Sequence, residues 1–240
     1  MRRASVLLLV VVTIAIVFIG SDELDTAPRL WTTILVAVLP PLSILQARAL
    51  SQIELPSRLA LYAQSALSLW LLAGATVVVT AIGDIGFAQI GLRPLPLPLL
   101  LVWTGGLTAG GVLLMLAAHR FGVRESATLA GLLPKSAAER LAFVGLSVTA
   151  GICEEVVFRG FLIPAIGTAV GSLVVAAVIA AAVFGLVHAY QGFPGAVRAA
   201  TLGALLSVVL LATGSIVPAI LAHAAIDVIG GFWLGPRLID

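Results

Sequence analysis

The sequence has few charged residues and a single cysteine. Asp, Glu, Lys and Arg make up 10% of the 240 residues, against about 25% in an ordinary soluble domain. Because Cys153 is the only cysteine, a disulfide within the chain is excluded. Aromatic residues are 6% of the chain and do not alternate with basic ones, so we expect no nucleic-acid partner. Hydrophobic residues are 61%, which indicates a protein of the lipid bilayer.

Eight apolar stretches account for most of the chain. A membrane-spanning helix needs about 20 predominantly apolar residues. The stretches near that length are 4–20, 30–46, 59–83, 97–118, 141–163, 172–189, 199–212 and 216–234. They predict an all-α, polytopic transmembrane helix bundle of about eight spans, forming one integral membrane domain. Residues 1–118 would supply four N-terminal spans, and residues 119–240 the four spans that carry the polar motifs described below.

The first stretch resembles a signal peptide because Arg2 and Arg3 precede it. No small-residue cleavage site precedes Ser21, and seven further stretches follow, so we expect an uncleaved span. Most basic residues fall on one side of an eight-span arrangement, and only Arg29 and Arg93 fall on the other. By the positive-inside rule, both termini are then expected in the cytoplasm.

Ionisable side chains occur inside three of the last four stretches, where hydrocarbon should exclude them. They are Glu154, Glu155 and Arg159 in CEEVVFRG, His188 in FGLVHAY, and His223 with Asp227 in LAHAAIDV. A charge near the centre of a bilayer costs roughly 2.5–3.5 kcal/mol on insertion scales. Such residues usually face one another or water, and they mark functional sites. The pattern predicts chemistry, or movement of ions, inside the membrane.

The spacing of these residues suggests different roles. Glu155 and Arg159 are four apart, so they share a helix face and can form an ion pair. Glu154 is rotated by about 100° from Glu155 and stays outside that pair, which makes it the better general base. Two imidazoles and a carboxylate, from His188, His223 and Asp227, are usual ligands for a divalent metal, most readily zinc. The same groups can also activate water without a metal.

Structural and transport roles would also account for these residues. A histidine in a membrane span is often a hydrogen-bond partner between helices, and an i, i+4 Glu–Arg pair can be structural. The cluster could serve as the relay of an ion- or proton-coupled transporter, although we find no internal repeat of the kind many transporters have. A non-catalytic membrane scaffold or immunity protein is a further alternative.

Three short motifs occur in order along the last four stretches. EEVVFR matches EExxxR, FGLVH matches FxxxH, and HAAID matches HxxxN/D. With these motifs the chain resembles the CPBP family of intramembrane proteases. That family includes the type II CAAX prenyl endopeptidases and the bacterial bacteriocin-processing or immunity (Abi-like) relatives. The resemblance covers about residues 151–230 and implies a glutamate-dependent, metal-assisted endopeptidase that cuts a membrane-associated protein or peptide.

The resemblance also implies roles for individual residues. Glu154 matches the water-activating glutamate, and Glu155 with Arg159 the supporting pair. His188, preceded by Phe184, matches the histidine of the second motif, and His223 with Asp227 the third motif. Eukaryotic-type members usually have Asn at the last position, whereas an ionised Asp cannot donate to an oxyanion. We therefore expect Asp227 to bind the metal or hold His223, and we expect a bacterial plasma-membrane protein with substrates other than CAAX proteins.

The depths of the motifs in the membrane set a geometric requirement. Glu154 lies about 20 Å along a straight helix that begins at Leu141, whereas His188 comes late in its own stretch and would lie nearer the cytoplasm. Straight, full-length, parallel helices cannot bring them together with His223. The sequence therefore predicts that at least one of the last four spans is short, strongly tilted or irregular, with Gly160 and Pro164 as candidate positions for a break.

Overall fold

The protein is a bundle of helices in the computed structural model, which describes residues 23–50, 56–83, 85, 87–121 and 131–234, and these residues contain no strand. The helices before the motifs are α2 (Thr26–Thr33), the π-helical η1 (Ile34–Val38), α3 (Leu39–Leu50), α4 (Arg58–Ile82), the 3₁₀ turn η2 (Phe87–Ile90) and α5 (Leu97–Arg120). The helices of the motif region are α7 (Ala137–Glu154), the π-helical η3 (Glu155–Leu162), α8 (Ile163–Val170), α9 (Leu173–Val187), the 3₁₀ turn η4 (Ala189–Gln191), α10 (Gly192–Thr213), α11 (Val217–Ile229) and the π-helical η5 (Gly230–Leu234).

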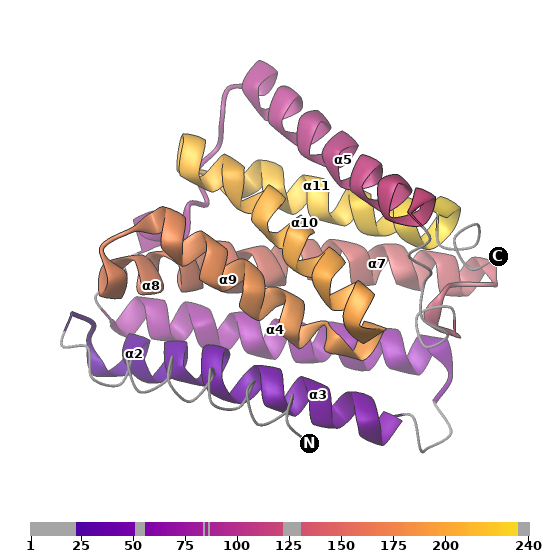
Figure 1. Ribbon diagram of the computed structural model, residues 1–240, viewed down its shortest axis with the longest axis horizontal. Helices are drawn as coiled ribbons and strands as arrows, with labels where there is room; N and C mark the ends of the chain where they lie inside the picture. Colours follow the sequence, from indigo (N-terminus) through magenta and orange to yellow (C-terminus); the bar gives the residue numbers. More distant parts are fainter. Residues whose placement is uncertain (1–22, 51–55, 84, 86, 122–130, 235–240) are drawn as a thin grey trace.

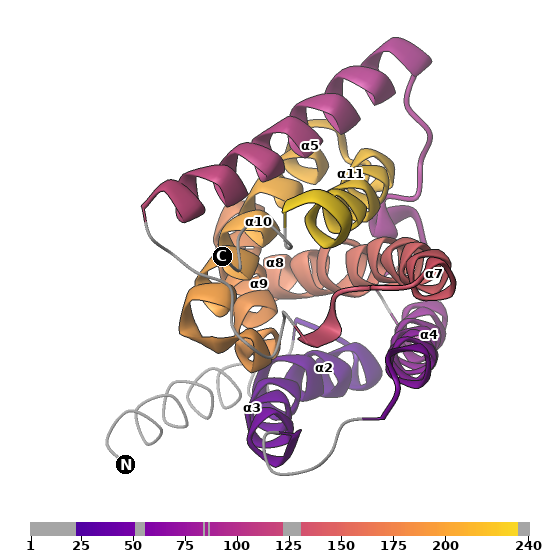
Figure 2. The same ribbon diagram turned by 90° about the vertical axis from the view of Figure 1, so that its right-hand side faces the viewer.

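Helix α7 lies at the centre of the bundle. In both views α4, and beyond it α2 and α3, lie on one side of α7, while α11 and then α5 lie on the other (Figures 1 and 2). Helices α9 and α10 pack along each other, and α11 packs along both α7 and α5. The three motif-bearing segments, α7–η3, α9 and α11, are thus close neighbours in the molecule.

One unbroken helix of 34 residues runs from Ala137 to Val170 and carries the first motif. At about 1.5 Å per residue it is some 51 Å long. A capping box starts it: Ser136 Oγ accepts from the Glu139 amide at 3.2 Å, and the Glu139 carboxylate accepts from the Ser136 amide at 3.0 Å. In its middle the helix takes the wider π-helical form over Glu155–Leu162, a form that often occurs at functional sites.

The predicted apolar stretches correspond to helices wherever they are described. Five helical segments are long and apolar enough to cross a membrane, namely Thr26–Gln46, Arg58–Ile82, Leu97–Arg120, Ala137–Val170 and Ala189–Thr213, and Leu173–Val187 and Val217–Trp233 are shorter apolar helices. The predicted first span, 4–20, lies outside the described residues. The all-α membrane bundle is therefore confirmed, while the number of eight spans stays a prediction.

The irregularity that the depth argument requires is present in three places. The helix that carries Glu154 contains a π-helical segment, and α9 and α11 have 15 and 13 residues. A break near Gly160 or Pro164 was a wrong expectation, because the helix continues through both residues. The backbone changes its winding there instead, which keeps the backbone N–H and C=O groups paired within the helix.

The largest buried cluster surrounds the π-helical segment. Every residue of η3 is buried, and its Val157, Phe158, Phe161 and Leu162 pack against side chains of α9 and of the η1–α3 region. Two charged residues of the first motif, Glu155 and Arg159, are thereby enclosed in apolar packing. Their charges must be compensated from within the protein.

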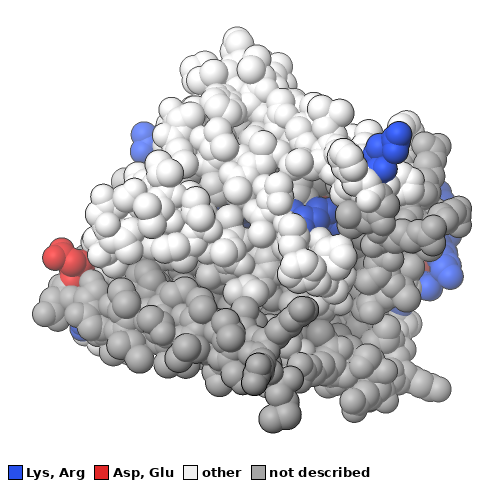
Figure 3. Space-filling view, in the orientation of Figure 1, with Lys and Arg blue, Asp and Glu red and all other residues white. Residues whose placement is uncertain are grey.

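Charged side chains gather at the ends of the bundle. In the space-filling view blue patches lie at the right-hand end, with one more at the upper left and one near the middle, a red patch lies at the left-hand end, and most of the rest of the described surface is white (Figure 3). The right-hand end holds the starts of α4 and α7 and the end of α5 (Figure 1), where Arg58, Arg120, Lys135 and Arg140 occur. This distribution agrees with an apolar belt across a bilayer; the cytoplasmic location of both termini stays a prediction.

Close backbone approach holds α9 against α10. A Cβ added at Gly185 would lie 2.6 Å from Ala196 O and 2.7 Å from Ala200 Cβ, so the two helices meet where no side chain fits between them. A Cβ added at Gly105 on α5, in contrast, would lie in open space.

We predict that Gly185→Ala lowers stability by about 1–3 kcal/mol, because backbone atoms must move to admit the methyl group. Thermal unfolding of the purified protein in detergent measures this as a lower Tm. Gly105→Ala is the matched control and should leave Tm unchanged or slightly higher. Equal Tm values for the two variants would contradict the observed packing of α9 on α10.

Candidate active site

The six ionisable residues of the motifs form one connected cluster. Glu154 ends α7, Glu155 and Arg159 lie in η3, His188 follows the last residue of α9, and His223 and Asp227 lie on α11. Each is within 4 Å of at least one other member. The structure therefore brings together all the residues that the sequence singled out.

Glu155 and Arg159 form a buried ion pair. Arg159 Nη1 donates to Glu155 Oε1 at 2.9 Å, and both side chains are at most 2% exposed. Nη2 of the same guanidinium donates to the backbone oxygen of Gly203 on α10 at 3.0 Å. The guanidinium also lies over the ring of Phe184, with Cζ 4.6 Å from the centroid. These three contacts compensate a charge that could not otherwise be enclosed in apolar packing.

The same oxygen of Glu155 orients His223. His223 Nδ1 lies 2.8 Å from Glu155 Oε1. Because a carboxylate paired with arginine only accepts hydrogen bonds, Nδ1 must carry the proton that it donates. In the neutral ring, Nε2 is then unprotonated, and it lies 3.7 Å from Glu154 Oε2. The supporting pair thus fixes the ring and tautomer of the histidine beside the candidate base.

A backbone carbonyl orients the second histidine in the same way. His188 Nδ1 lies 2.8 Å from Phe184 O, an acceptor, so Nδ1 again carries the donated proton. His188 Nε2 faces Glu154 Oε2 at 3.9 Å. The i, i+4 spacing of the second motif has a direct structural meaning, because Phe184 supplies both this carbonyl and the ring that packs on His188 at a centroid distance of 4.4 Å.

Glu154 faces both imidazoles without a hydrogen bond. Its Oε2 is buried and has no hydrogen-bond partner among the described residues, because 3.7 and 3.9 Å exceed the usual hydrogen-bond length. A buried carboxylate oxygen without a partner is costly. Its surroundings suit a small hydrogen-bond donor, such as water, or a cation between Glu154, His188 and His223.

Asp227 lies at the exposed side of the cluster. Its side chain is 37% exposed, against 13% for Glu154, and its Oδ2 lies 3.8 Å from His223 Nε2. The structure therefore places Asp227 beside His223 but beyond hydrogen-bond length, and its expected role, binding the metal or holding His223, stays a prediction. The exposure of Asp227 shows the side on which the cluster is accessible.

The short α9 resolves the difference in depth. Helix α9 ends well before the end of the bundle at which α4 and α7 begin (Figure 1). His188, which caps α9, therefore lies inside the bundle at the level of Glu154 and not near its surface. The predicted stretch, 172–189, ends within two residues of α9; what the sequence did not show is that this end lies at the level of Glu154.

Two contributions to the cluster were not found from the sequence. Gly203 has no functional side chain, and α10 contains no ionisable residue near it, so no pattern identified its carbonyl as a partner of Arg159. Phe184 appeared only as a motif residue. In the structure its ring touches Arg159, His188 and His223, with centroid distances of 4.4 and 6.1 Å to the two imidazoles.

The donor set fits a metal ion in chemistry, but as the side chains lie its atoms are too far apart to hold one. Both histidines have Nδ1 engaged and Nε2 available, as metal-binding histidines usually do. Around a tetrahedral zinc, with bonds of about 2.0–2.2 Å, donor atoms lie roughly 3.3 Å apart, whereas the distances here are 3.7–3.9 Å. As the side chains lie, no three His, Cys, Asp or Glu residues within the described ranges are arranged to hold a metal ion.

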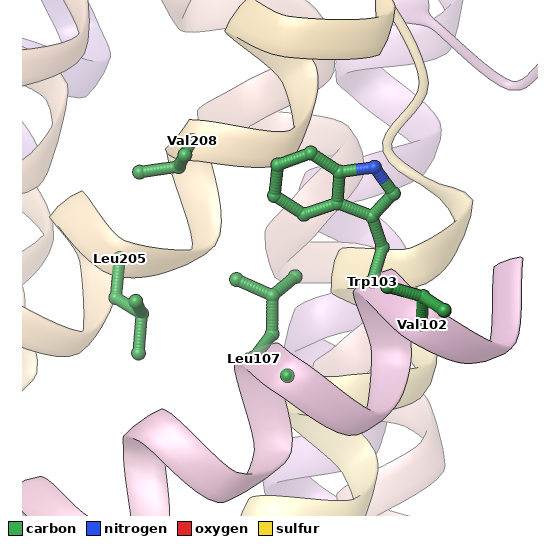
Figure 4. Close-up of a pocket in the computed structure, with 6 residues that line it drawn as sticks. Val102, Trp103, Leu107, Leu205 and Val208 are labelled. Carbon is green, nitrogen blue, oxygen red and sulfur yellow. The ribbon is translucent and has the colours of Figure 1, made fainter. Parts of the chain in front are cut away.

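A hollow elsewhere on the bundle does not belong to this cluster. It has a volume of about 330 Å³, lies between α5 and α10, and is lined by Val102, Trp103, Gly106, Leu107, Leu205 and Val208 (Figure 4). None of the six ionisable residues lines it. Its apolar walls suit the hydrocarbon that surrounds a membrane protein.

Comparison with known proteins identifies the motif region. Residues 136–229 match the family model described as type II CAAX prenyl endopeptidase Rce1-like. Searches of curated proteins and of solved structures gave no match. The matched segment begins at the cap of α7 and ends with α11, so it contains the whole cluster.

We predict that Arg159→Met destabilises the protein by about 3–5 kcal/mol, because it leaves the Glu155 carboxylate buried without a counter-charge. Adding Glu155→Gln removes that charge and should restore a large part of the loss. Unfolding in mixed detergent measures both free energies. If the double variant were less stable than Arg159→Met alone, the ion pair would not be the main constraint on these two residues.

Proposed function

We propose that this integral membrane protein is an intramembrane endopeptidase. The proposal starts from the match of residues 136–229 to the Rce1-like family of CAAX prenyl endopeptidases. The protein would hydrolyse a peptide bond in a membrane-associated protein or peptide. The observation that carries the proposal is the position of Glu154, whose unpartnered Oε2 faces Nε2 of both motif histidines.

Glu154 is the group to activate water. A general base needs a carboxylate that is not neutralised by a close cation, and Arg159 is engaged by Glu155. Water held at Glu154 Oε2 gives it a proton while the water oxygen attacks the scissile carbonyl carbon. When the C–N bond breaks, Glu154 passes that proton to the departing amine. The products are a carboxylic acid and an amine, so the atoms of water and peptide balance.

The histidines hold the reacting groups in place. With the proton on Nδ1, one of the two Nε2 atoms can accept a hydrogen bond from the hydrogen of the attacking water that Glu154 does not take. A second proton on the ring would turn Nε2 into a donor to the scissile carbonyl. Their orientation by Phe184 O and Glu155 Oε1 is set before substrate binds, which reduces the reorganisation required in the transition state.

A divalent metal, most readily zinc, is part of the proposal. His188 and His223 would hold it through Nε2, with Asp227 as the oxygen ligand, so that Glu154 stays free to act as the base. When bound, such an ion lowers the pKa of its water to about 7 and polarises a carbonyl. Support comes from the engaged Nδ1 atoms, which leave Nε2 of both histidines available, and from Asp227 Oδ2, which lies 3.8 Å from His223 Nε2.

We predict that Glu154→Gln reduces peptide hydrolysis in proteoliposomes by about 10²–10⁴-fold, because the amide cannot accept the proton of water. Folding should persist, since Glu154 Oε2 makes no hydrogen bond within the described part of the chain. Glu23→Gln, at an exposed position just before α2, is the matched control. Undiminished hydrolysis by Glu154→Gln, or ion transport without hydrolysis in the wild type, would refute the proposal.

We also predict that zinc content depends on the motif histidines. Elemental analysis of purified protein should find about one zinc ion per chain in the wild type. His188→Gln combined with His223→Gln should lose it, whereas His119→Gln, at an exposed position near the end of α5, should retain it. Equal metal content in all three proteins would exclude the motif histidines as ligands.

A further inference from the structure

Helix α10 contributes to the cluster although it carries none of the three motifs. Its contribution is the backbone oxygen of Gly203, which accepts hydrogen bonds from Arg159 Nη2 at 3.0 Å and from Ser207 Oγ at 2.8 Å. Both donors are buried, with Arg159 1% and Ser207 2% exposed. Because Gly203 lies inside α10, the same oxygen is also the i→i+4 acceptor of its own helix, so Arg159 shares an acceptor that α10 already uses.

A side chain at Gly203 would make close contacts with Arg159 and Phe184. A Cβ at this position would lie 3.2 Å from Arg159 Nη2, 3.2 Å from Phe184 Cδ1 and 3.5 Å from Ala181 Cα. Its φ is not positive, so its conformation suits any residue. A methyl group here would press on the guanidinium and on the ring beneath it, both of which contact the histidines or their partners.

The contact continues through a chain of hydrogen bonds to the histidine beside the candidate base. Gly203 O holds Nη2 of Arg159, Nη1 of Arg159 holds Glu155 Oε1, and the same Oε1 holds His223 Nδ1. The other oxygen of Glu155 has no hydrogen-bond partner among the described residues. The position of Glu155, and with it the direction of His223 Nε2, therefore depends on where Arg159 is held.

We propose that Gly203 is a positioning residue of the active site, which sets the orientation of His223 by anchoring Arg159 from α10. The proposal rests on the proposed function for its kinetic consequence, but its structural consequence is independent of it. Gly203 touches no reacting group; its carbonyl acts through Arg159 and Glu155, and its lack of a side chain also leaves room for the Phe184 ring.

The test compares Gly203→Ala with Gly145→Ala. Both add one methyl group to a helix glycine, and Gly145, on α7, has open space at that position. The chain contains three histidines, so ¹⁵N labelling of their rings gives a simple NMR spectrum of the purified protein. In the wild type and in Gly145→Ala, His223 should show protonated Nδ1 and bare Nε2. In Gly203→Ala, its signals should shift towards a mixture of tautomers.

Peptide hydrolysis gives the second readout. Gly203→Ala should lower kcat by about 10–100-fold, as loss of an outer partner of a site histidine does, with KM within about two-fold of the wild type. A purely structural effect would instead reduce the amount of folded protein and leave kcat per folded molecule unchanged. Wild-type His223 signals and kcat in Gly203→Ala would overturn the proposal.

A second variant covers the case in which Gly203→Ala fails to fold. Arg159→Lys keeps the charge and the glycine, but an ammonium cannot reproduce the two-armed contact to Glu155 and Gly203. It should change the His223 signals and kcat in the same direction, and unchanged signals would overturn the proposal. If the wild type hydrolysed no peptide, the proposed function would fail, while the NMR comparison would still decide the role of Gly203.

Discussion

The arrangement of the motif helices depends on one buried ion pair, Glu155–Arg159. Glu155 and Arg159 lie in a segment whose every residue is buried, where an unpaired charge would be very costly. Their partners come from three other elements: the carbonyl of Gly203 on α10, the ring of Phe184 on α9, and the imidazole of His223 on α11. Satisfying this pair therefore requires the four helices of the motif region to meet at one point.

The helix lengths follow from that meeting point. Glu154 lies near the middle of a 34-residue helix. His188 and His223, which lie on other helices, must therefore be placed at the same level in the bundle. Helix α9 meets this requirement by ending at His188, and the chain then turns through η4 into α10. Helix α11 begins only six residues before His223. The π-helical winding of η3 lets the motif helix pass this point without a break.

Much of this site could be predicted because charged residues are rare in apolar sequence. Glu154, Glu155, Arg159, His188 and His223 were recognisable from the cost of burying them, and the i, i+4 spacing of the first motif indicated the ion pair that the structure contains. The depth argument correctly required short or irregular helices. In these respects local spacing and the energetics of a bilayer were sufficient.

Other features could not be predicted because they are properties of the backbone. The depth at which α9 ends, the π-helical winding of η3 and the acceptor role of Gly203 leave no mark in residue type, because Leu, Val, Ala and Gly are common throughout these helices. Phe184 was recognised as part of the second motif, but the sequence did not show that its carbonyl and its ring both serve the site. A glycine required for space differs from any other helix glycine only by what packs against it.

The central claim is that the cluster delivers water to a peptide bond within the membrane. Its most direct test is single-turnover cleavage of membrane-anchored peptides by the wild-type protein in proteoliposomes prepared in H₂¹⁸O, with mass spectrometry of the products. The account predicts one ¹⁸O atom in the new carboxyl terminus and a free amine on the other fragment. Absence of any cleavage across a varied set of anchored peptides, or a product without the solvent oxygen, would contradict it.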